Sequence, residues 1–311
     1  MNPTLSPADL AAYFERIGYA GPRTASAATL RALHLLHPQA IPFENLDPLL
    51  GLTPQLDLDS LMKKLVRERR GGYCYEQNLL FRAVLDTLGF ETTGLAARVL
   101  WDNPSNPMPS RTHMALLVEN DEETWLADVG FGGMTPSAPL RFETGREQGT
   151  PHEPYRIDLI DRGDYLLQVK LGNAPDPALC TASGRTPGTT SKGIWKPIYR
   201  FDLEPQFPSD YSVANHYVST HPRSLFVNTL MAARLAPTSR LALMDCRLTI
   251  HGATSEQREL ASVAELRALL SEEFGLALPD TNGKATSAEL DALLARVIQR
   301  GSQQPSQQPS H

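Results

Sequence analysis

The chain has 311 residues, of which 41% are hydrophobic and 21% are charged, and its net charge is −6. These values are ordinary for globular proteins and exclude a wholly disordered chain, a collagen and a coiled coil. The mild negative charge argues against a nucleic-acid binder that neutralises phosphates, and the length is enough for two or three domains.

No apolar run approaches the roughly 18 residues that a transmembrane helix needs, and the first residues lack the pattern of a signal peptide. The three cysteines, Cys74, Cys180 and Cys246, are too few and too scattered for a disulfide framework or a cysteine-rich zinc site. We therefore expect a cytoplasmic protein that has no bound metal and neither nucleic-acid nor membrane partners.

The first 90 residues have a helical pattern. Ser6, Pro7 and a following acidic residue are typical of a helix start, and Gly18 ends the first apolar run. Further helices are expected at 30–36, where Pro38 ends the run, at 58–68, and at 74–89.

Residues from about 90 to 190 have strand composition with partial alternation of apolar and polar side chains. Strands are expected at 93–101, 112–119, 123–129, 155–161 and 165–171. A loop at 175–193 follows, and after it we expect a strand at 194–203, a helix at 209–219, and mixed elements up to about 300, among them a strand at 243–248. The polar tail contains QQPS twice and is expected to be disordered.

The segment Arg70–Asn78, RGGYCYEQN in one-letter code, indicates a reactive cysteine. Its two glycines let the backbone turn sharply, and Cys74 follows them where an apolar helix begins. The N–H groups and the positive dipole at a helix N-terminus stabilise a thiolate and can bind an oxyanion. The alternative is a small buried hydrophobic side chain, which is a common fate of cysteine.

A cysteine nucleophile needs a nearby base and a group that orients this base. His113 lies at the start of one expected strand and the next expected strand contains Asp128. A two-residue loop of Asn120 and Asp121 would place them opposite each other. A three-residue loop would place them on opposite faces, and taken alone His113 fits a strand-end histidine. The glycines at 130, 132 and 133 predict either a ligand-binding loop or a structural turn.

Several motifs occur in the order in which a known family has them. They are Ile41–Leu46, which contains PFENL, then Arg70–Asn78, Arg111–Met114, Asp128–Gly132, Leu203–Gln206, Asn215 and Ser224–Phe226. Through them the sequence resembles the arylamine N-acetyltransferase family over residues 5–280. The short connection at 162–164 resembles the bacterial type and predicts a cleft that no long insertion covers.

The resemblance implies an α+β multidomain fold: a helical bundle at 1–90, a β-barrel at 91–190, an α/β lid at 191–300 and a disordered tail at 301–311. It also implies a cysteine-protease-like triad of Cys74, His113 and Asp128. The implied reaction is ping-pong transfer of an acetyl group from the co-substrate acetyl-CoA, through acetyl-Cys74, to an arylamine, an arylhydrazine or an N-hydroxyarylamine. We expect a role in xenobiotic metabolism and a monomer or homodimer.

The resemblance further implies which residues contact the substrates. Phe43 and Phe131 correspond to aromatic walls of the acceptor pocket, with ordinary core packing as the alternative. Ser110, Thr112 and Tyr217 correspond to positions beside coenzyme A, and packing on the barrel is the alternative for Tyr217.

Glu44 and Arg70 both belong to motifs, and we expect them to form a structural ion pair that braces the turn before Cys74.

The same triad also serves other reactions. A cysteine hydrolase, a transglutaminase-like enzyme or an amide synthase would share these motifs, and a binding protein with an inactive triad is the non-enzymatic alternative. Labelling of Cys74 by acetyl-CoA would distinguish the transferase from a protease.

Overall fold

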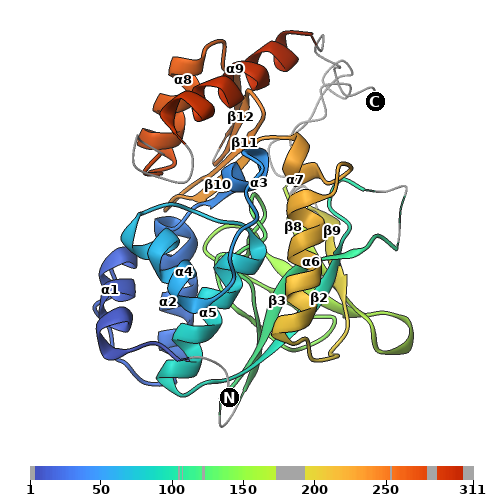
Figure 1. Cartoon of the computed structure of the whole chain (residues 1–311). Coiled ribbons are helices and arrows are strands. Elements are labelled where there is room, and N and C mark those ends of the chain that lie inside the picture. Colours follow the sequence, from blue (N-terminus) through green and yellow to red (C-terminus); the bar gives the residue numbers. More distant parts are fainter. Residues whose placement is uncertain are drawn as a thin grey trace, which may run out of the picture.

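Figure 1 shows the computed structural model of the chain, which describes residues 4–103, 106, 108–120, 123–172, 193–252, 254–278 and 286–303. Helices form the N-terminal part, a large sheet follows, and a smaller sheet with helices beside it forms the C-terminal part. This is the α+β arrangement that the sequence predicted. None of the described helices is long and apolar enough to cross a membrane.

The first 90 residues form helices, and the first of them and the one at Cys74 begin and end where the sequence indicated. The Ser6 side chain accepts a hydrogen bond from the Asp9 N–H at the start of the first helix, and Gly18, with φ of 70°, ends it. Gly89, with φ of 92°, ends the helix that begins at Cys74. The elements are α1 (Pro7–Ile17), α2 (Ala27–Ala40), α3 (Leu46–Leu49), α4 (Leu58–Leu61), the π-helical η1 (Met62–Arg67) and α5 (Cys74–Leu88).

The second helix continues past the proline that was expected to end it. α2 contains Pro38 and runs to Ala40. Only the end of the helix lies beyond this proline, so its missing N–H removes a single hydrogen bond from the last turn. The Ile41 N–H donates to the His37 oxygen at 2.8 Å and closes that turn.

The described strands of the central part form an antiparallel sheet in the order β5-β4-β3-β2-β9-β8-β7-β6, which curls into a nearly closed barrel. Apolar side chains from both ends of this order, including Leu140 and Tyr155, lie in one buried cluster, as closure of the sheet requires. The elements are β2 (Glu91–Val99), β3 (Arg111–Glu119), β4 (Thr124–Ala127), β5 (Leu140–Arg141), β6 (Glu147–Gln148), β7 (Tyr155–Leu159), the 3-10 helix η2 (Asp161–Gly163), β8 (Tyr165–Leu171) and β9 (Ile194–Phe201).

Strand β9 lies in this sheet, although the boundary predicted at residue 190 assigned it to the third domain. Ala97 of β2 pairs with Phe201 of β9, and Leu167 of β8 pairs with Tyr199. The pattern of a strand does not reveal its partners, so the boundary was placed before β9 instead of after it. The division into three domains otherwise stays a prediction.

The hairpin of β3 and β4 has a longer loop than expected. Glu119 pairs with Thr124, so residues 120–123 connect the strands in place of the two residues predicted. The Glu123 N–H donates to the Asn120 side chain at 3.0 Å, and the Asn120 N–H donates to the Glu123 oxygen at 3.1 Å. Compared with the predicted pairing of residue 119 with residue 122, the observed register is shifted by two residues. Because side chains alternate between the two faces, a shift by an even number leaves His113 and Asp128 on the same face, as predicted.

The second sheet combines distant parts of the chain, in the order β1-β10-β11-β12-β13. Phe43 of β1 pairs with Ala233 of β10, and the buried Leu46 packs in the same apolar cluster as Leu290 and Leu294. The C-terminal sheet thus holds the segment before the reactive cysteine. The elements are β1 (Phe43–Glu44), α6 (Pro208–Thr220), α7 (Leu225–Asn228), β10 (Met231–Leu235), β11 (Arg240–Met244), β12 (Arg247–His251), β13 (Ser255–Glu259), α8 (Val263–Ala268), the π-helical η4 (Leu269–Glu273) and α9 (Ser287–Gln303).

Two C-terminal predictions were wrong. Met244 pairs with Arg247, so Cys246 lies in the two-residue turn between β11 and β12 and not inside a strand. α9 continues to Gln303, past the predicted start of the tail, because its apolar face packs in the C-terminal core. Cys180, most of the loop predicted at 175–193 and residues 304–311 lie outside the described residues.

Candidate active site

Cys74 is the first residue of α5, and it is buried behind a tight turn. The turn needs both of its glycines. A Cβ on Gly71 would lie 2.2 Å from the Pro42 carbonyl oxygen, and a Cβ on Gly72 would lie 2.7 Å from a carboxylate oxygen of Glu76. The first N–H groups of a helix have no partner within it, so the thiol lies beside backbone donors.

A buried network of charges supports this turn. Arg70 donates to Glu44 at 2.7 and 3.1 Å and to Asp47 at 3.0 Å. Lys64 contacts both Asp47 and Glu76 at 2.7 Å. The ion pair predicted between Glu44 and Arg70 is therefore confirmed, and it belongs to a group of three carboxylates and two cations.

Glu76 joins this network to the helix start. One of its carboxylate oxygens contacts Lys64, and the other accepts the Tyr73 N–H at 3.1 Å. Burial raises the pKa of Glu76 to about 7, although the positive charge of Lys64 acts in the opposite direction. Glu76 thus links Lys64 to the backbone at the start of α5.

The structure brings the three predicted catalytic residues together. His113 lies on β3 with its Nε2 2.7 Å from an oxygen of Asp128. The imidazole also forms a hydrogen bond with the Cys74 side chain, which leaves Nδ1 as the nitrogen that faces the sulfur. The Sγ of Cys74 lies 3.7 Å from the carbonyl oxygen of Thr112. These three residues are 1–3% exposed, so water reaches little of them.

The charges of this site stabilise each other. Burial by itself lowers the pKa of His113, but the charge of Asp128, the hydrogen bond to it and the contact with Cys74 raise it to about 10. Burial raises the pKa of Asp128, but the charge of His113 and hydrogen bonds from His113, Gly130 and Asn78 bring it below its ordinary value. Near neutral pH the histidine is therefore protonated and the aspartate is not.

Asn78 was not singled out from the sequence, yet it connects three parts of the site. Its amide nitrogen donates to the Met114 oxygen at 2.8 Å and to Asp128 at 3.1 Å, and its oxygen accepts the Val129 N–H at 3.1 Å. A residue four positions after the nucleophile lies on the same face of the helix. Its spacing from Cys74 was the signal that could have revealed it.

Two histidines of α2 support the same region from behind, and the sequence analysis also missed them. His34 Nε2 accepts the Asp128 N–H at 3.1 Å, and His37 Nε2 lies 2.7 Å from Oε1 of Gln77. The Gln77 amide in turn donates to backbone oxygens beside the cysteine turn, at 2.8 and 3.1 Å. Burial lowers the pKa of His34 to about 4 and that of His37 to about 3, so both are neutral at pH 7.

Aromatic rings line the region beside the triad. The ring centroids of Phe131 and Tyr199 lie 5.2 and 5.0 Å from that of His113. Phe43 comes close to the glycine-rich segment, since a Cβ on Gly132 would lie 3.5 Å from its ring. Phe131 is thus near His113, and Phe43 is near the loop that follows Asp128. Their role in binding stays a prediction.

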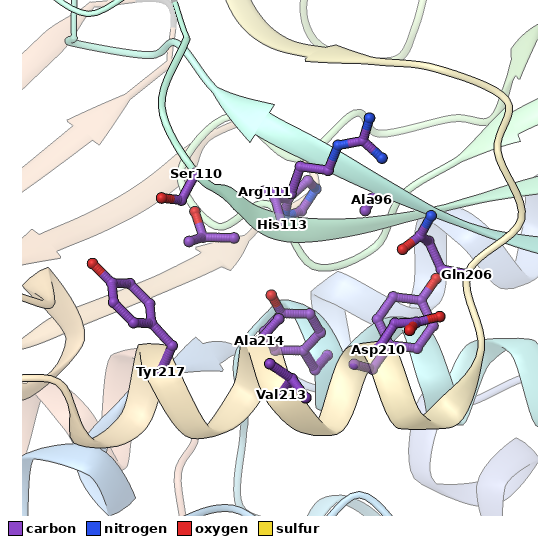
Figure 2. Close-up of a pocket in the computed structure, with 12 residues that line it drawn as sticks. Ala96, Ser110, Arg111, His113, Gln206, Asp210, Val213, Ala214 and Tyr217 are labelled. Atoms are coloured by element: carbon purple, nitrogen blue, oxygen red, sulfur yellow. The ribbon is translucent and has the colours of Figure 1, made fainter.

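A cleft of about 330 Å³ opens beside His113 (Figure 2). Ser110, which directly precedes β3, and Thr112 of β3 line it on one side, and Tyr217 lines it from α6. The cleft therefore unites the three residues predicted to contact coenzyme A. The Tyr217 ring is 40% exposed and stacks on His221, with centroids 4.6 Å apart. The two predicted acceptor-side phenylalanines are not among the lining residues of this cleft.

The chain is similar to other proteins along most of its length. A family model described as N-acetyltransferase matches residues 26–282. The arylamine N-acetyltransferase of Escherichia coli is 42% identical over 286 residues, which are 91% of this chain and 94% of the relative. The arylamine N-acetyltransferase / N-hydroxyarylamine O-acetyltransferase of Salmonella typhimurium is 37% identical over 289 residues, 92% of this chain and 95% of the relative.

Solved structures agree with this similarity. The Mycobacterium marinum arylamine N-acetyltransferase in complex with CoA has a TM-score of 0.82 and 38% identity, and the match covers 93% of this chain and 99% of that one. The arylamine N-acetyltransferase from Salmonella typhimurium has a TM-score of 0.80 and 37% identity, with coverage of 94% and 100%. These matches confirm the predicted fold class.

Proposed function

The chain belongs to the arylamine N-acetyltransferase family and is therefore an acyltransferase, and we propose that it acetylates arylamines with acetyl-CoA by a ping-pong mechanism. Cys74 carries the acetyl group between the two substrates. The observation that supports this proposal is the chain of contacts from Cys74 through His113 to Asp128 beside an open cleft. We extend the acceptors to arylhydrazines and to N-hydroxyarylamines, which the name of one relative includes.

In the first half-reaction the Cys74 thiolate attacks the carbonyl carbon of acetyl-CoA. A carbon–sulfur bond to Cys74 forms, the bond to the coenzyme sulfur breaks, and His113 gives its proton to the departing coenzyme A. The pKa of His113, raised to about 10, keeps this proton on the imidazole near neutral pH. The Cys74 N–H at the N-terminus of α5 donates to the oxyanion, and Asp128 holds the ring.

In the second half-reaction an arylamine attacks the acetyl carbon of acetyl-Cys74. The neutral His113 accepts the proton from the amine nitrogen, and Cys74 leaves as a thiolate, which restores the starting state. Arylamines suit this step because they are weak bases and remain uncharged near neutral pH. Proton transfer by a positioned side chain contributes about 10²–10⁴-fold to such a rate.

The two substrates use different sides of the triad in this proposal. The cleft with Ser110, Thr112 and Tyr217 receives the pantetheine end of acetyl-CoA, because it opens directly beside His113. The aromatic rings of Phe43 and Phe131 face the amine, since a flat aromatic acceptor packs well against aromatic side chains.

Intact mass measured after brief mixing with acetyl-CoA, without an acceptor, tests the proposal. We expect one acetyl group on the wild type and on Cys246→Ala, a control that removes another buried thiol. We expect none on Cys74→Ala. An added arylamine should then discharge the label. If the wild type acquires no acetyl group and releases no coenzyme A, the proposed donor is wrong and another reaction of the triad applies.

A further inference from the structure

Arg240 is a buried cation outside the site described above. It lies on β11 of the C-terminal sheet and is 2% exposed. Its Nη1 donates to the Thr135 carbonyl oxygen at 2.7 Å, its Nε to Glu153 at 2.8 Å, and its Nη2 lies 3.3 Å from the Tyr155 hydroxyl. A guanidinium can contact these three acceptors at once because its donors point in fixed, divergent directions. Arg240 therefore connects the C-terminal sheet to the barrel side of the molecule.

The contacts of Arg240 converge on the end of the glycine-rich loop 130–135. Within this loop the Gly132 N–H donates to the Thr135 hydroxyl at 2.8 Å, and the Thr135 N–H donates to the Gly132 oxygen at 3.1 Å. The Tyr155 hydroxyl, which Arg240 contacts, donates to the Met134 oxygen at 3.1 Å. Two successive carbonyl groups of the loop are thus bound from outside it.

The same loop reaches the reacting atoms at its other end. A Cβ on Gly130 would lie 2.9 Å from the Cα of Cys74, and the Phe131 ring meets the His113 ring edge-on at 84°. A segment with three glycines in four residues has little stiffness of its own, so its position depends on the groups that bind it. The position of Phe131 therefore depends on what holds Met134 and Thr135.

We propose that Arg240 is a positioning residue for the amine: it holds the loop 130–135 so that Phe131 borders the space in which the acceptor meets acetyl-Cys74. This inference rests on the proposed function. Asp128, which holds His113, accepts the Gly130 N–H of the loop but also has supports outside the loop in Asn78 and His34. The loop does not line the cleft assigned to acetyl-CoA. Loss of Arg240 should therefore impair the second half-reaction and spare the first.

The test measures both half-reactions of Arg240→Met by rapid mixing. The rate of acetyl-enzyme formation from acetyl-CoA is followed first, and its discharge is then followed as a function of arylamine concentration. We expect the second-order rate constant of discharge to fall about 10- to 100-fold, since a small misplacement of a substrate-positioning group has effects of this size. The rate of acetyl-enzyme formation should stay within about twofold of the wild type.

Arg234→Met is the matched control. Arg234 lies on the neighbouring strand β10, and its guanidinium donates to the Gln39 and Glu273 oxygens, away from the loop. This variant should lose stability, but the ratio of the rate of acetyl-enzyme formation to the rate of its discharge by amine should stay as in the wild type. Equal effects of both arginine variants on that ratio would show that Arg240 only stabilises the fold and would overturn the inference.

Thr135→Val keeps the test decisive if Arg240→Met does not fold. This change removes the hydroxyl that accepts the Gly132 N–H and leaves a side chain of the same shape. It should also slow discharge by amine and leave acetyl-enzyme formation unchanged. A variant that forms the acetyl-enzyme slowly but reacts normally with amine would contradict the inference. Failure of the wild type to form any acetyl-enzyme would instead contradict the proposed function.

Discussion

Two loops meet at the candidate site, and they are held in different ways. The turn before Cys74 is braced by charged side chains of the N-terminal part, with Arg70 bound to Glu44 and Lys64 bound to Glu76. The loop after Asp128 is braced mainly by uncharged groups, such as Asn78 and His34, and by one arginine that lies 105 residues after its acceptor. The position of Cys74 therefore depends on ion pairs within the N-terminal part, and the positions of Asp128 and Phe131 depend on hydrogen bonds from more distant segments.

Because the two loops are held differently, substitutions in them should have different effects. Removal of one partner from a buried charge group leaves an uncompensated charge, which costs stability. Removal of one neutral hydrogen bond shifts a loop and costs less stability, but it changes geometry beside the reacting atoms. Variants at the cysteine turn should mainly affect unfolding, and variants at the loop should mainly affect rates.

The largest effect is expected at the contact between the two regions. Asp128→Asn keeps the size of the side chain but removes the charge that holds the His113 proton. We expect the rate of acetyl transfer to fall about 10⁴-fold, as for the loss of a triad carboxylate. The steady-state rate with an arylamine measures it, and Asp164→Asn, whose partner Arg200 lies on the barrel, is the control. A loss smaller than about tenfold would show that Asp128 does not orient the base.

The next effect tests the cysteine turn. Glu44→Ala leaves the buried Arg70 with Asp47 as its remaining carboxylate partner. We expect the free energy of unfolding to fall by about 3–5 kcal/mol. Urea denaturation measures this, and Glu44→Gln, which retains an acceptor, should lose less. Unchanged stability together with lost activity would contradict a structural role and indicate that Glu44 acts in catalysis.

A smaller effect is expected in the pH dependence of stability, through His34 beside Asp128. His34 has a pKa of about 4 in the folded protein and an ordinary value of 6.5, so the unfolded chain takes up the proton first as the pH falls. The stability that His34 contributes is present above pH 6.5 and is lost towards pH 4, by about 3 kcal/mol. His34→Gln keeps an acceptor for the Asp128 N–H without titrating there, so it should lose less stability over this window.

The contribution of His113 to stability changes with pH in the opposite direction to that of His34. Its folded pKa of about 10 lies above 6.5, so its contribution is complete below pH 6.5 and is lost as the pH rises towards 10. Urea midpoints from pH 4 to 10 should therefore pass through a maximum near neutrality. A His34→Gln variant with the acid-side slope of the wild type would contradict the assignment of that slope to His34.

The smallest effect is expected in the cleft. Tyr217→Ala removes a ring that is partly exposed, and we expect the KM for acetyl-CoA to rise by about two- to fivefold with little change in kcat. Tyr217→Phe keeps the ring and serves as the control. No change of KM in the alanine variant would favour the alternative that Tyr217 only packs on the barrel.

The sequence predicted those parts of the site that depend on neighbours in the chain. The two glycines and the cap at α5 place Cys74, and the even register shift between β3 and β4 preserved the face that His113 and Asp128 share. The predicted loop length was wrong by two residues, because the Asn120 side chain closes a longer connection. The strand β9 was predicted but placed in the third domain instead of the barrel sheet, since the pattern of a strand does not reveal its partners.

What the sequence by itself determined is therefore local: helix ends, the turn before the cysteine, and the types of residue that the chemistry needs. The motif order also determined the family. Only the tertiary structure decided that β9 completes the barrel, that Asn78 and His34 hold the aspartate, and that Arg240 reaches the loop beside it. The physical reason is that caps and turns use neighbouring backbone groups, whereas long-range hydrogen bonds and closure of a sheet depend on where distant segments meet.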